Sequence, residues 1–167
     1  MIEPGGTVGI LGAGQLGRML AMAAARMGLR ARLYAPEADP PAAHVAPVTR
    51  AAWDDADALS AFAASVDVAT LEFENVPLGA VETLAALVAV RPGARALAVA
   101  QDRLTEKAFL NEAGAATAPF APVSDAASLD AALAALGLPA ILKTRRLGYD
   151  GKGQARLNSA ADAPAAL

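Results

Sequence analysis

The sequence has no cysteine and only one histidine. Disulfide bonds and thiolate metal sites are therefore excluded, and a cluster of histidine ligands cannot form. Aromatic residues make up only 4% of the chain, and no apolar run approaches the roughly 18 residues that a membrane-spanning helix needs. The first residues also lack the basic stretch and cleavage site of a signal peptide. These absences predict a cytoplasmic protein that does not bind membranes.

Positive charge is also in short supply. The 167 residues include 14 Lys and Arg against 17 Asp and Glu, which gives a net charge of −3. Without an excess of basic residues the chain has no electrostatic footprint for a polyanion, so nucleic acid is not expected as a partner. Hydrophobic residues make up 55% of the chain, enough apolar surface to offset the entropy of folding. The composition therefore predicts a chain that folds around a hydrophobic core.

The first hundred residues alternate between short apolar runs and helical patterns. Strands are predicted at 7–11, 31–34, 66–71 and 87–90, and helices at 15–27, 53–64 and 77–87. Parallel strands need crossovers of this length, so the pattern predicts a Rossmann-like, doubly wound parallel sheet in residues 1–100. On the first helix, apolar residues recur every three or four positions and are expected to pack inward: Leu16, Met19, Leu20, Ala23 and Met27.

A second domain is predicted for residues 101–167. A charged helix is expected at 102–113, then a proline-broken extended segment at 117–123. Ser124 is expected to cap a helix that ends near Leu136. Two short apolar runs, 140–143 and 155–157, flank a glycine-rich segment and predict a β-hairpin.

The pattern G-x-G-x-x-G occurs at Gly12, Gly14 and Gly17, between the first strand and the first helix. Glycines let the backbone approach a phosphate, and the helix N-terminus favours its negative charge. A dinucleotide site would also need an acidic residue at the end of the second strand, where the chain has Tyr34 and Ala35. A phosphate-bearing ligand, a nicotinamide dinucleotide and a purely structural turn all remain open for this motif.

The second glycine loop follows Lys143, which is expected to end a buried strand. The loop reads RRLGYDGKGQ and holds three glycines and three cations within ten residues. Such a hairpin could fold over a polyphosphate while its cations offset the phosphate charge. It is not a Walker motif, because G-x-x-x-x-G-K-[ST] is absent and the loop joins two strands. A surface hairpin with solvated charges is the alternative interpretation.

Two carboxylates follow the third predicted strand. Glu72 and Glu74 lie where open α/β sheets place their ligands, at the carboxyl ends of the strands. If the segment is extended, alternation puts both side chains on the same side. The pattern predicts that at least one of them faces a substrate and leaves open which of the two acts.

Four motifs together resemble one family: GILGAGQLGRM at 9–19, LEFENVP at 71–77, QDRLTEK at 101–107 and LKTRRLGYDGKGQ at 142–154. In this order and spacing they resemble the N5-carboxyaminoimidazole ribonucleotide synthetases of the ATP-grasp superfamily. The resemblance implies a pre-ATP-grasp domain at 1–100, followed by the start of an ATP-grasp domain at 101–167. It also implies a homodimeric ligase of purine biosynthesis that uses Mg-ATP and bicarbonate to carboxylate 5-aminoimidazole ribonucleotide, releasing ADP and phosphate.

The resemblance also assigns roles to residues of this chain. Those expected to contact ATP are Arg103, Lys143, Gly148, Tyr149, Asp150, Gly151, Lys152, Gly153 and Gln154. Tyr149, Asp150 and Lys152 are also expected to reach the ribonucleotide or the bicarbonate, which places them with Glu72 and Glu74 as catalytic candidates. Gly14, Gln15 and Leu16 are expected to lie against the ribonucleotide. The magnesium ligands are expected beyond Leu167, and no metal ligand is assigned within the chain.

Members of this family are longer than this chain, so the resemblance predicts an N-terminal fragment that is inactive by itself. Two other functions stay open from the residues alone. A nicotinamide-dinucleotide-dependent oxidoreductase would use the first glycine motif. A non-catalytic ribonucleotide-binding module would bind its ligand without turnover.

Overall fold

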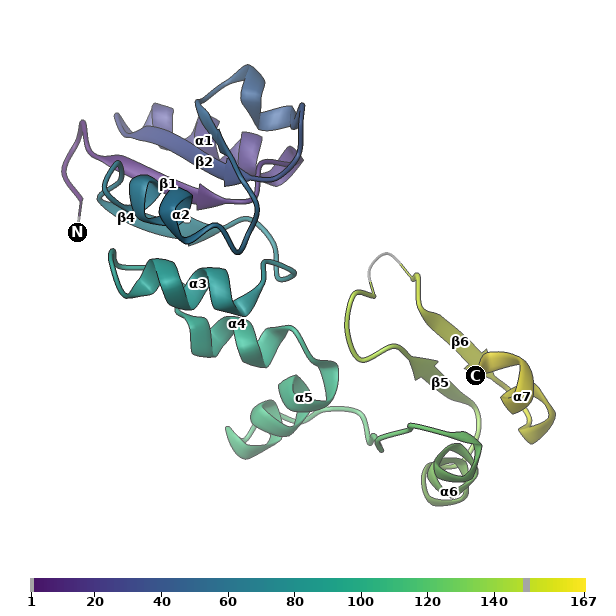
Figure 1. Ribbon diagram of the computed structural model, residues 1–167. Coiled ribbons are helices and arrows are strands. Elements are labelled where there is room, and N and C mark those ends of the chain that lie inside the picture. The colour runs from purple at the N-terminus through teal and green to yellow at the C-terminus, as the bar shows by residue number, and fades with distance from the viewer. Residues whose placement is uncertain (1, 149–150) are drawn as a thin grey trace. The chain divides into compact units, whose positions relative to one another are not determined.

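The computed structural model describes residues 2–148 and 151–167 (Figure 1). The chain divides into two compact units, Met1–Ala98 and Val99–Leu167. The first unit contains a parallel sheet and the second contains an antiparallel hairpin. The α/β fold class expected from the sequence is confirmed.

The sheet of the first unit has the strand order β3-β2-β1-β4, and every pair is parallel. Its strands are β1 (Thr7–Leu11), β2 (Arg30–Ala35), β3 (Val48–Arg50) and β4 (Val68–Leu71). The helices between and after them are α1 (Gln15–Arg26), the 3₁₀ helix η1 (Pro41–His44), α2 (Ala56–Ala63), α3 (Leu78–Ala85) and α4 (Ala94–Ala100). All four strands therefore present their carboxyl ends at one edge of the sheet.

Alternation along the strands fills a core on each face of this sheet. Ile10 and Leu33 join a buried cluster that includes Ala21 of α1. The neighbouring residues Leu11 and Tyr34 join the other cluster, which includes residues of α2, α3 and α4. Because successive strand residues point to opposite faces, both faces are apolar and both must be covered. Figure 1 shows α1 and α2 on opposite sides of the sheet.

The sequence patterns missed or misplaced three features of this unit. Strand β3 was not expected, because three residues give too little periodicity. The strand expected at 87–90 is reduced to a single bridge between Val90 and Ala69, and helix α4 follows at positions left unassigned. Helix α2 begins at Ala56 rather than at Trp53, because the Asp55 carboxylate accepts a hydrogen bond from the Ala58 N–H and caps the helix there.

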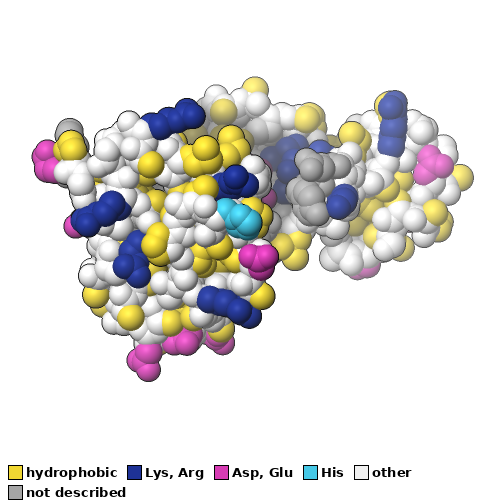
Figure 2. Space-filling model, turned by 90° about the horizontal axis from the view of Figure 1, so that it is seen from above, with side chains coloured by type: hydrophobic (Ala, Val, Ile, Leu, Met, Phe, Trp, Pro, Cys, Tyr) yellow, Lys and Arg dark blue, Asp and Glu magenta, His cyan; other side chains and the backbone are white. Residues whose placement is uncertain are grey.

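The prediction of the inward face of α1 was wrong. The buried residues of this helix are Gly17, Ala21 and Ala24. Its larger apolar side chains are all exposed to solvent: Leu16, Met19, Leu20 and Met22, together with Met27 at its C-cap. Small residues allow the helix to lie close against the sheet, which leaves no space for the long side chains on that side. Figure 2 shows hydrophobic side chains reaching the surface across the face drawn there.

The second unit contains α5 (Arg103–Glu112), α6 (Ala126–Leu136), the strands β5 (Ala140–Lys143) and β6 (Gln154–Leu157), the 3₁₀ helix η2 (Ala160–Asp162) and α7 (Ala163–Ala166). Its buried cluster is small: Leu129, Leu157 and Ala163. Asp125, not Ser124, caps α6, because its carboxylate accepts from the Ser128 N–H in a capping box. In the described part of the chain, no helix combines the length and the apolar character needed to cross a membrane.

Candidate functional site

The first glycine motif forms the tight turn from β1 into α1. Gly12 has φ +101°, which side chains rarely adopt, and its N–H donates to the Tyr34 carbonyl at 2.9 Å. Gly14 is the N-cap residue of α1 and provides no side chain to cap it. The first N–H groups of the helix must therefore find their acceptor elsewhere.

Glu72 provides that acceptor from the residue directly after β4. Its Oε1 accepts a hydrogen bond from the Gly14 N–H at 2.8 Å, and its Oε2 accepts one from the Gly17 N–H. The Glu72 N–H in turn donates to the Leu11 carbonyl at 3.0 Å, which continues the pairing of β4 with β1. A carboxylate at this helix terminus also interacts favourably with the helix dipole. The amides that the sequence pattern assigned to a phosphate are thus bound to a carboxylate of the protein.

This contact explains the spacing of the three glycines. A Cβ added at Gly12, Gly14 or Gly17 would in each case approach the side chain of Glu72 too closely. At Gly14 it would lie 2.9 Å from Glu72 Oε1, and at Gly17 also 2.9 Å from the Gly12 carbonyl oxygen. Only glycine therefore leaves room for this carboxylate.

The other candidates around this turn are more open. Gln15 and Leu16 are exposed on the first turn of α1, and Gly14 is half-buried. Glu74 is exposed, whereas Glu72 is half-buried. The extended geometry considered for the segment with Glu72 and Glu74 is not found, because the chain bends and turns there. The two carboxylates therefore do not share a strand face, and only Glu72 is bound into the glycine turn.

The second glycine loop connects β5 to β6. Lys143 pairs with Gln154 at the end of the ladder, and the Thr144 N–H donates to the Gly153 carbonyl at 2.8 Å just beyond it. Lys143 itself is exposed, and β5 alternates between half-buried and exposed residues, so the expectation of a buried strand was wrong. A Cβ at Gly153 would lie 2.6 Å from Thr144 Oγ1, so glycine lets the two arms meet closely.

The described ends of this loop need unusual backbone angles. Leu147 has φ +62°, Gly151 +77° and Gly153 +67°. Leu147 is the one non-glycine residue in the described part of the chain with a positive φ. Lys152 and Gln154 are exposed on the second arm, and Gly148 is half-buried on the first. Tyr149 and Asp150, both predicted site residues, lie outside the residues that the structure describes.

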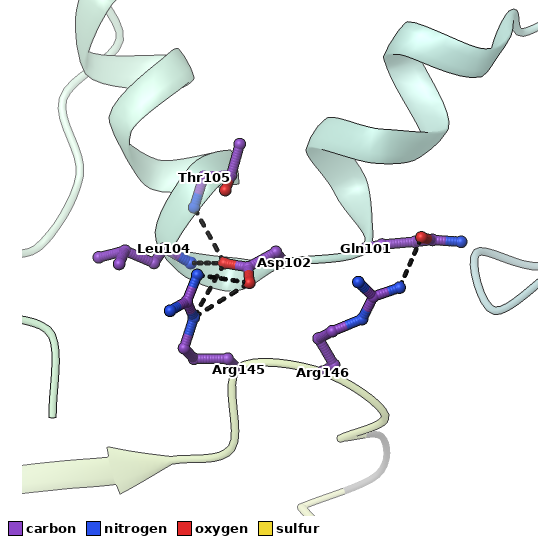
Figure 3. A network of polar contacts seen from close by, with 6 residues as sticks. All are labelled: Gln101, Asp102, Leu104, Thr105, Arg145 and Arg146. Carbon is purple, nitrogen blue, oxygen red and sulfur yellow. Dashed lines mark hydrogen bonds and ion pairs between the residues drawn. The ribbon is translucent and has the colours of Figure 1, made fainter. Parts of the chain in front are cut away.

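Two cations of this loop form polar contacts with other residues of the second unit (Figure 3). Arg145 forms an ion pair with Asp102, with 2.7 Å between Nη2 and Oδ2 and 3.0 Å between Nε and Oδ2. Arg146 Nη2 donates to Gln101 Oε1 at 2.7 Å. The Arg103 N–H donates to the Arg145 carbonyl at 3.0 Å. The structure thus brings predicted residue Arg103 next to the start of the loop.

Asp102 is the centre of this network. Its Oδ1 also accepts from the Leu104 and Thr105 N–H groups at 3.0 and 3.2 Å, so it caps α5. Burial alone would raise the pKa of Asp102, but the hydrogen bond from Arg145 and those from Thr105 and Leu104 outweigh it and hold the pKa below its ordinary value. The residue is therefore a carboxylate at neutral pH.

Sequence reasoning missed Asp102, Gln101 and Arg145 as a group. Asp102 could have been found as a helix cap from its position before α5. Its partner Arg145 lies 43 residues away in the sequence, and no local spacing rule connects such positions. Among the described residues, no group of three His, Asp or Glu side chains could hold a metal ion.

Two hollows of the first unit lie apart from these residues. One, of about 500 Å³, is lined by residues such as Thr7, Arg30 and Pro47. The other, of about 570 Å³, has Trp53, Pro77 and Thr83 in its lining. Neither lining includes a predicted site residue.

The comparisons with known proteins match both parts of the chain. Residues 6–101 match the model of the ribonucleotide synthetase preATP-grasp domain, and residues 108–167 match that of the ATP-grasp domain. The chain is 57% identical over 159 residues to the N5-carboxyaminoimidazole ribonucleotide synthase of Brucella melitensis, covering 95% of this chain and 44% of that protein. The chain thus spans less than half the length of this relative.

Solved structures show the same similarity. The ADP complex of N5-carboxyaminoimidazole ribonucleotide synthetase matches with a TM-score of 0.92 at 40% identity, over 99% of this chain and 44% of that one. The N5-carboxyaminoimidazole synthase of Aspergillus clavatus, in complex with ADP and 5-aminoimidazole ribonucleotide, matches with a TM-score of 0.81 at 29% identity. That match covers 98% of this chain and 43% of that one.

Proposed function

Because the chain belongs to the family with a ribonucleotide synthetase preATP-grasp domain, we propose that it serves the ATP-dependent carboxylation of 5-aminoimidazole ribonucleotide in purine biosynthesis. In this proposal ATP phosphorylates bicarbonate to carboxyphosphate and leaves as ADP. Carboxyphosphate then delivers its carbon dioxide to the exocyclic amine, which loses a proton, and phosphate is released. The product is N5-carboxyaminoimidazole ribonucleotide.

The observation that carries this proposal is the match of residues 108–167 to the ATP-grasp domain. That range contains Lys143 and the described arms of the hairpin loop. Lys143 ends β5 with an exposed ammonium group, and the half-buried Gly148 and exposed Gly153 keep the backbone of the arms free of bulky side chains. A cation beside a glycine-rich backbone suits a polyphosphate. We therefore assign the ATP phosphates to Lys143, Arg103 and residues 148–154.

The ribonucleotide is assigned to the first unit. Gly14, Gln15 and Leu16 lie at the carboxyl edge of the parallel sheet, where open α/β folds bind ligands. Glu72 is already bonded to the Gly14 and Gly17 amides, so a phosphate would have to displace it from them. We infer that Glu72 instead keeps the turn in shape and offers its carboxylate to hydroxyl groups of the ligand. Glu74 remains the second carboxylate candidate.

Several parts of this proposal depend on more than the described residues. Magnesium would accompany ATP and reduce the repulsion between phosphate and carboxyphosphate oxygens. The described residues provide no set of three metal ligands, so we assign the magnesium ligands to the region of the relatives beyond the matched part. The proposal also includes a homodimer, bicarbonate as co-substrate and a cytoplasmic location.

A chimaera tests the proposed function. This chain would replace the matched segment of the Brucella melitensis synthase, and ADP release from Mg-ATP and bicarbonate would be measured with and without 5-aminoimidazole ribonucleotide. We expect release that the ribonucleotide stimulates. Lys143→Ala should raise the KM for ATP by about tenfold or more, since a charge-assisted phosphate contact contributes roughly 1.5–3 kcal/mol.

The matched control is Arg156→Ala, which removes an exposed cation of the same hairpin whose Nε donates to Asn158 Oδ1. It should leave the KM for ATP unchanged. A folded chimaera whose ADP release ignores the ribonucleotide would contradict the proposed substrate. Oxidation of NADH without ADP release would favour the oxidoreductase alternative.

A further inference from the structure

We propose that Asp102 and Arg145 are positioning residues, which fix the start of the phosphate-binding loop against the first turn of α5. The inference rests on the proposed function of that loop and adds two residues that the family resemblance did not assign. Three contacts join positions 101–103 to positions 145–146: the Asp102–Arg145 ion pair, the Gln101–Arg146 hydrogen bond, and the hydrogen bond from the Arg103 N–H to the Arg145 carbonyl. Figure 3 shows the two guanidinium groups pointing toward these partners.

The geometry indicates that Arg145 and Arg146 position the loop and do not bind phosphate directly. The Arg145 guanidinium presents both Nε and Nη2 to Asp102, a paired arrangement that Lys could not reproduce. Arg146 directs Nη2 to Gln101, whose residue is almost fully buried at 6% exposure. The charge of Arg145 is therefore already balanced by a carboxylate within the protein.

The energetics point the same way. The Arg145 side chain is 55% exposed and that of Asp102 is 15% exposed, and ion pairs with such access to water contribute little to global stability. The same contacts can still hold a backbone segment in one place, because each restricts the same short stretch of chain. Asp102 adds a second constraint by capping α5 with the same carboxylate.

The consequence concerns the two cations assigned to ATP. Arg103 contributes its N–H to the Arg145 carbonyl, and Lys143 precedes Arg145 by two residues at the end of β5. Loss of the ion pair should let the first arm of the loop move relative to α5. Lys143 and Arg103 would then spend less time in the arrangement that binds one polyphosphate.

The test compares variants of the chimaera described above by two readouts. Amide hydrogen exchange of residues 144–148 reports the position of the arm, and equilibrium dialysis with Mg-ATP reports binding. The variants are Arg145→Gln and Asp102→Asn, since Asn still caps a helix but carries no charge. Both should speed exchange and raise the dissociation constant for Mg-ATP by about fivefold, a shift typical of contacting pairs. The double variant should bind Mg-ATP no more weakly than either single variant, because both substitutions break the same ion pair.

Two controls separate this inference from the proposed function. Lys143→Ala should weaken the binding of Mg-ATP without speeding amide exchange of residues 144–148. Arg156→Gln should change neither the binding nor the exchange. Arg145→Lys keeps the charge but not the paired geometry. Its amide exchange and its affinity for Mg-ATP should therefore lie between those of the unsubstituted protein and those of Arg145→Gln. Unchanged exchange in Arg145→Gln would overturn the inference, as would faster exchange with unchanged Mg-ATP binding. If the unsubstituted chimaera and its Lys143→Ala variant showed the same lack of saturable binding, the ATP assignment itself would fail and the inference with it.

Discussion

In the glycine turn after β1, backbone amides bind a carboxylate from another strand, whereas in the hairpin between β5 and β6 the loop is held by its own cations. Glu72 fills the first turn and leaves no space for a Cβ at any of its three glycines. In the second loop, Arg145 and Arg146 reach outward to Asp102 and Gln101. Both segments use glycine for positive φ angles and for close packing, at Gly12 against Glu72 and at Gly153 against Thr144. They differ in what holds them in place, which is a carboxylate in the first and two guanidinium groups in the second.

The largest effect is expected from Gly12→Ala in the first turn. The substitution forces a side chain into φ +101° and brings its Cβ to 2.8 Å from Glu72 Cδ. We expect the free energy of unfolding of the first unit to fall by about 3 kcal/mol or more. Urea denaturation would measure it. Gly79→Ala is the control, because nothing lies within 4 Å of its Cβ position in α3; an equal loss there would contradict the packing argument.

Glu72→Gln should have the next largest effect. Gln offers one acceptor oxygen and one NH₂ group, so one of the Gly14 and Gly17 amides would lose its acceptor. We expect a loss of about 2 kcal/mol in unfolding free energy, measured as above. Glu74→Gln, at an exposed position, should change it by less than about 0.5 kcal/mol. Equal effects of the two substitutions would mean that Glu72 does not hold the turn.

In the second loop, Leu147→Gly should stabilise the hairpin slightly. Leu147 has φ +62° and is 73% exposed, so glycine relieves strain without removing a buried side chain. We expect a gain of up to about 1 kcal/mol, measured as slower amide exchange in β5 and β6. Leu147→Ala is the matched control, because it removes the side chain but keeps the strain. A gain from both variants would rule out the backbone explanation.

The smallest effect is expected from pH. Because hydrogen bonds hold the pKa of Asp102 below its ordinary value, the contribution of its ion pair is complete above about pH 4. That contribution is lost as the pH falls through the lower pKa of the folded state. Carboxyl ¹³C shifts would follow the titration directly. Arg145→Gln should move the titration midpoint of Asp102 upward, and Arg156→Gln should not. An unmoved midpoint in Arg145→Gln would mean that Arg145 does not lower the pKa of Asp102.

The sequence predicted the parallel α/β unit because its strands and helices have strong local periods. Strand β1 and the hairpin strands fell close to their expected positions for this reason. It mispredicted the inward face of α1, because apolar spacing alone cannot show that Ala21 and Ala24 pack closer than Met19. Glu72 was found as a candidate, but its binding in the glycine turn depends on a contact 58 residues away in sequence.

The exposed methionines of α1 and its C-cap have a practical consequence. Met19, Met22 and Met27 are 57%, 44% and 71% exposed, and none of them belongs to a buried cluster. Peroxide should convert them to sulfoxides without disrupting a core. Mass spectrometry detects each added oxygen atom. Protection of these three sulfur atoms from oxidation would therefore report any surface that comes to cover the helix.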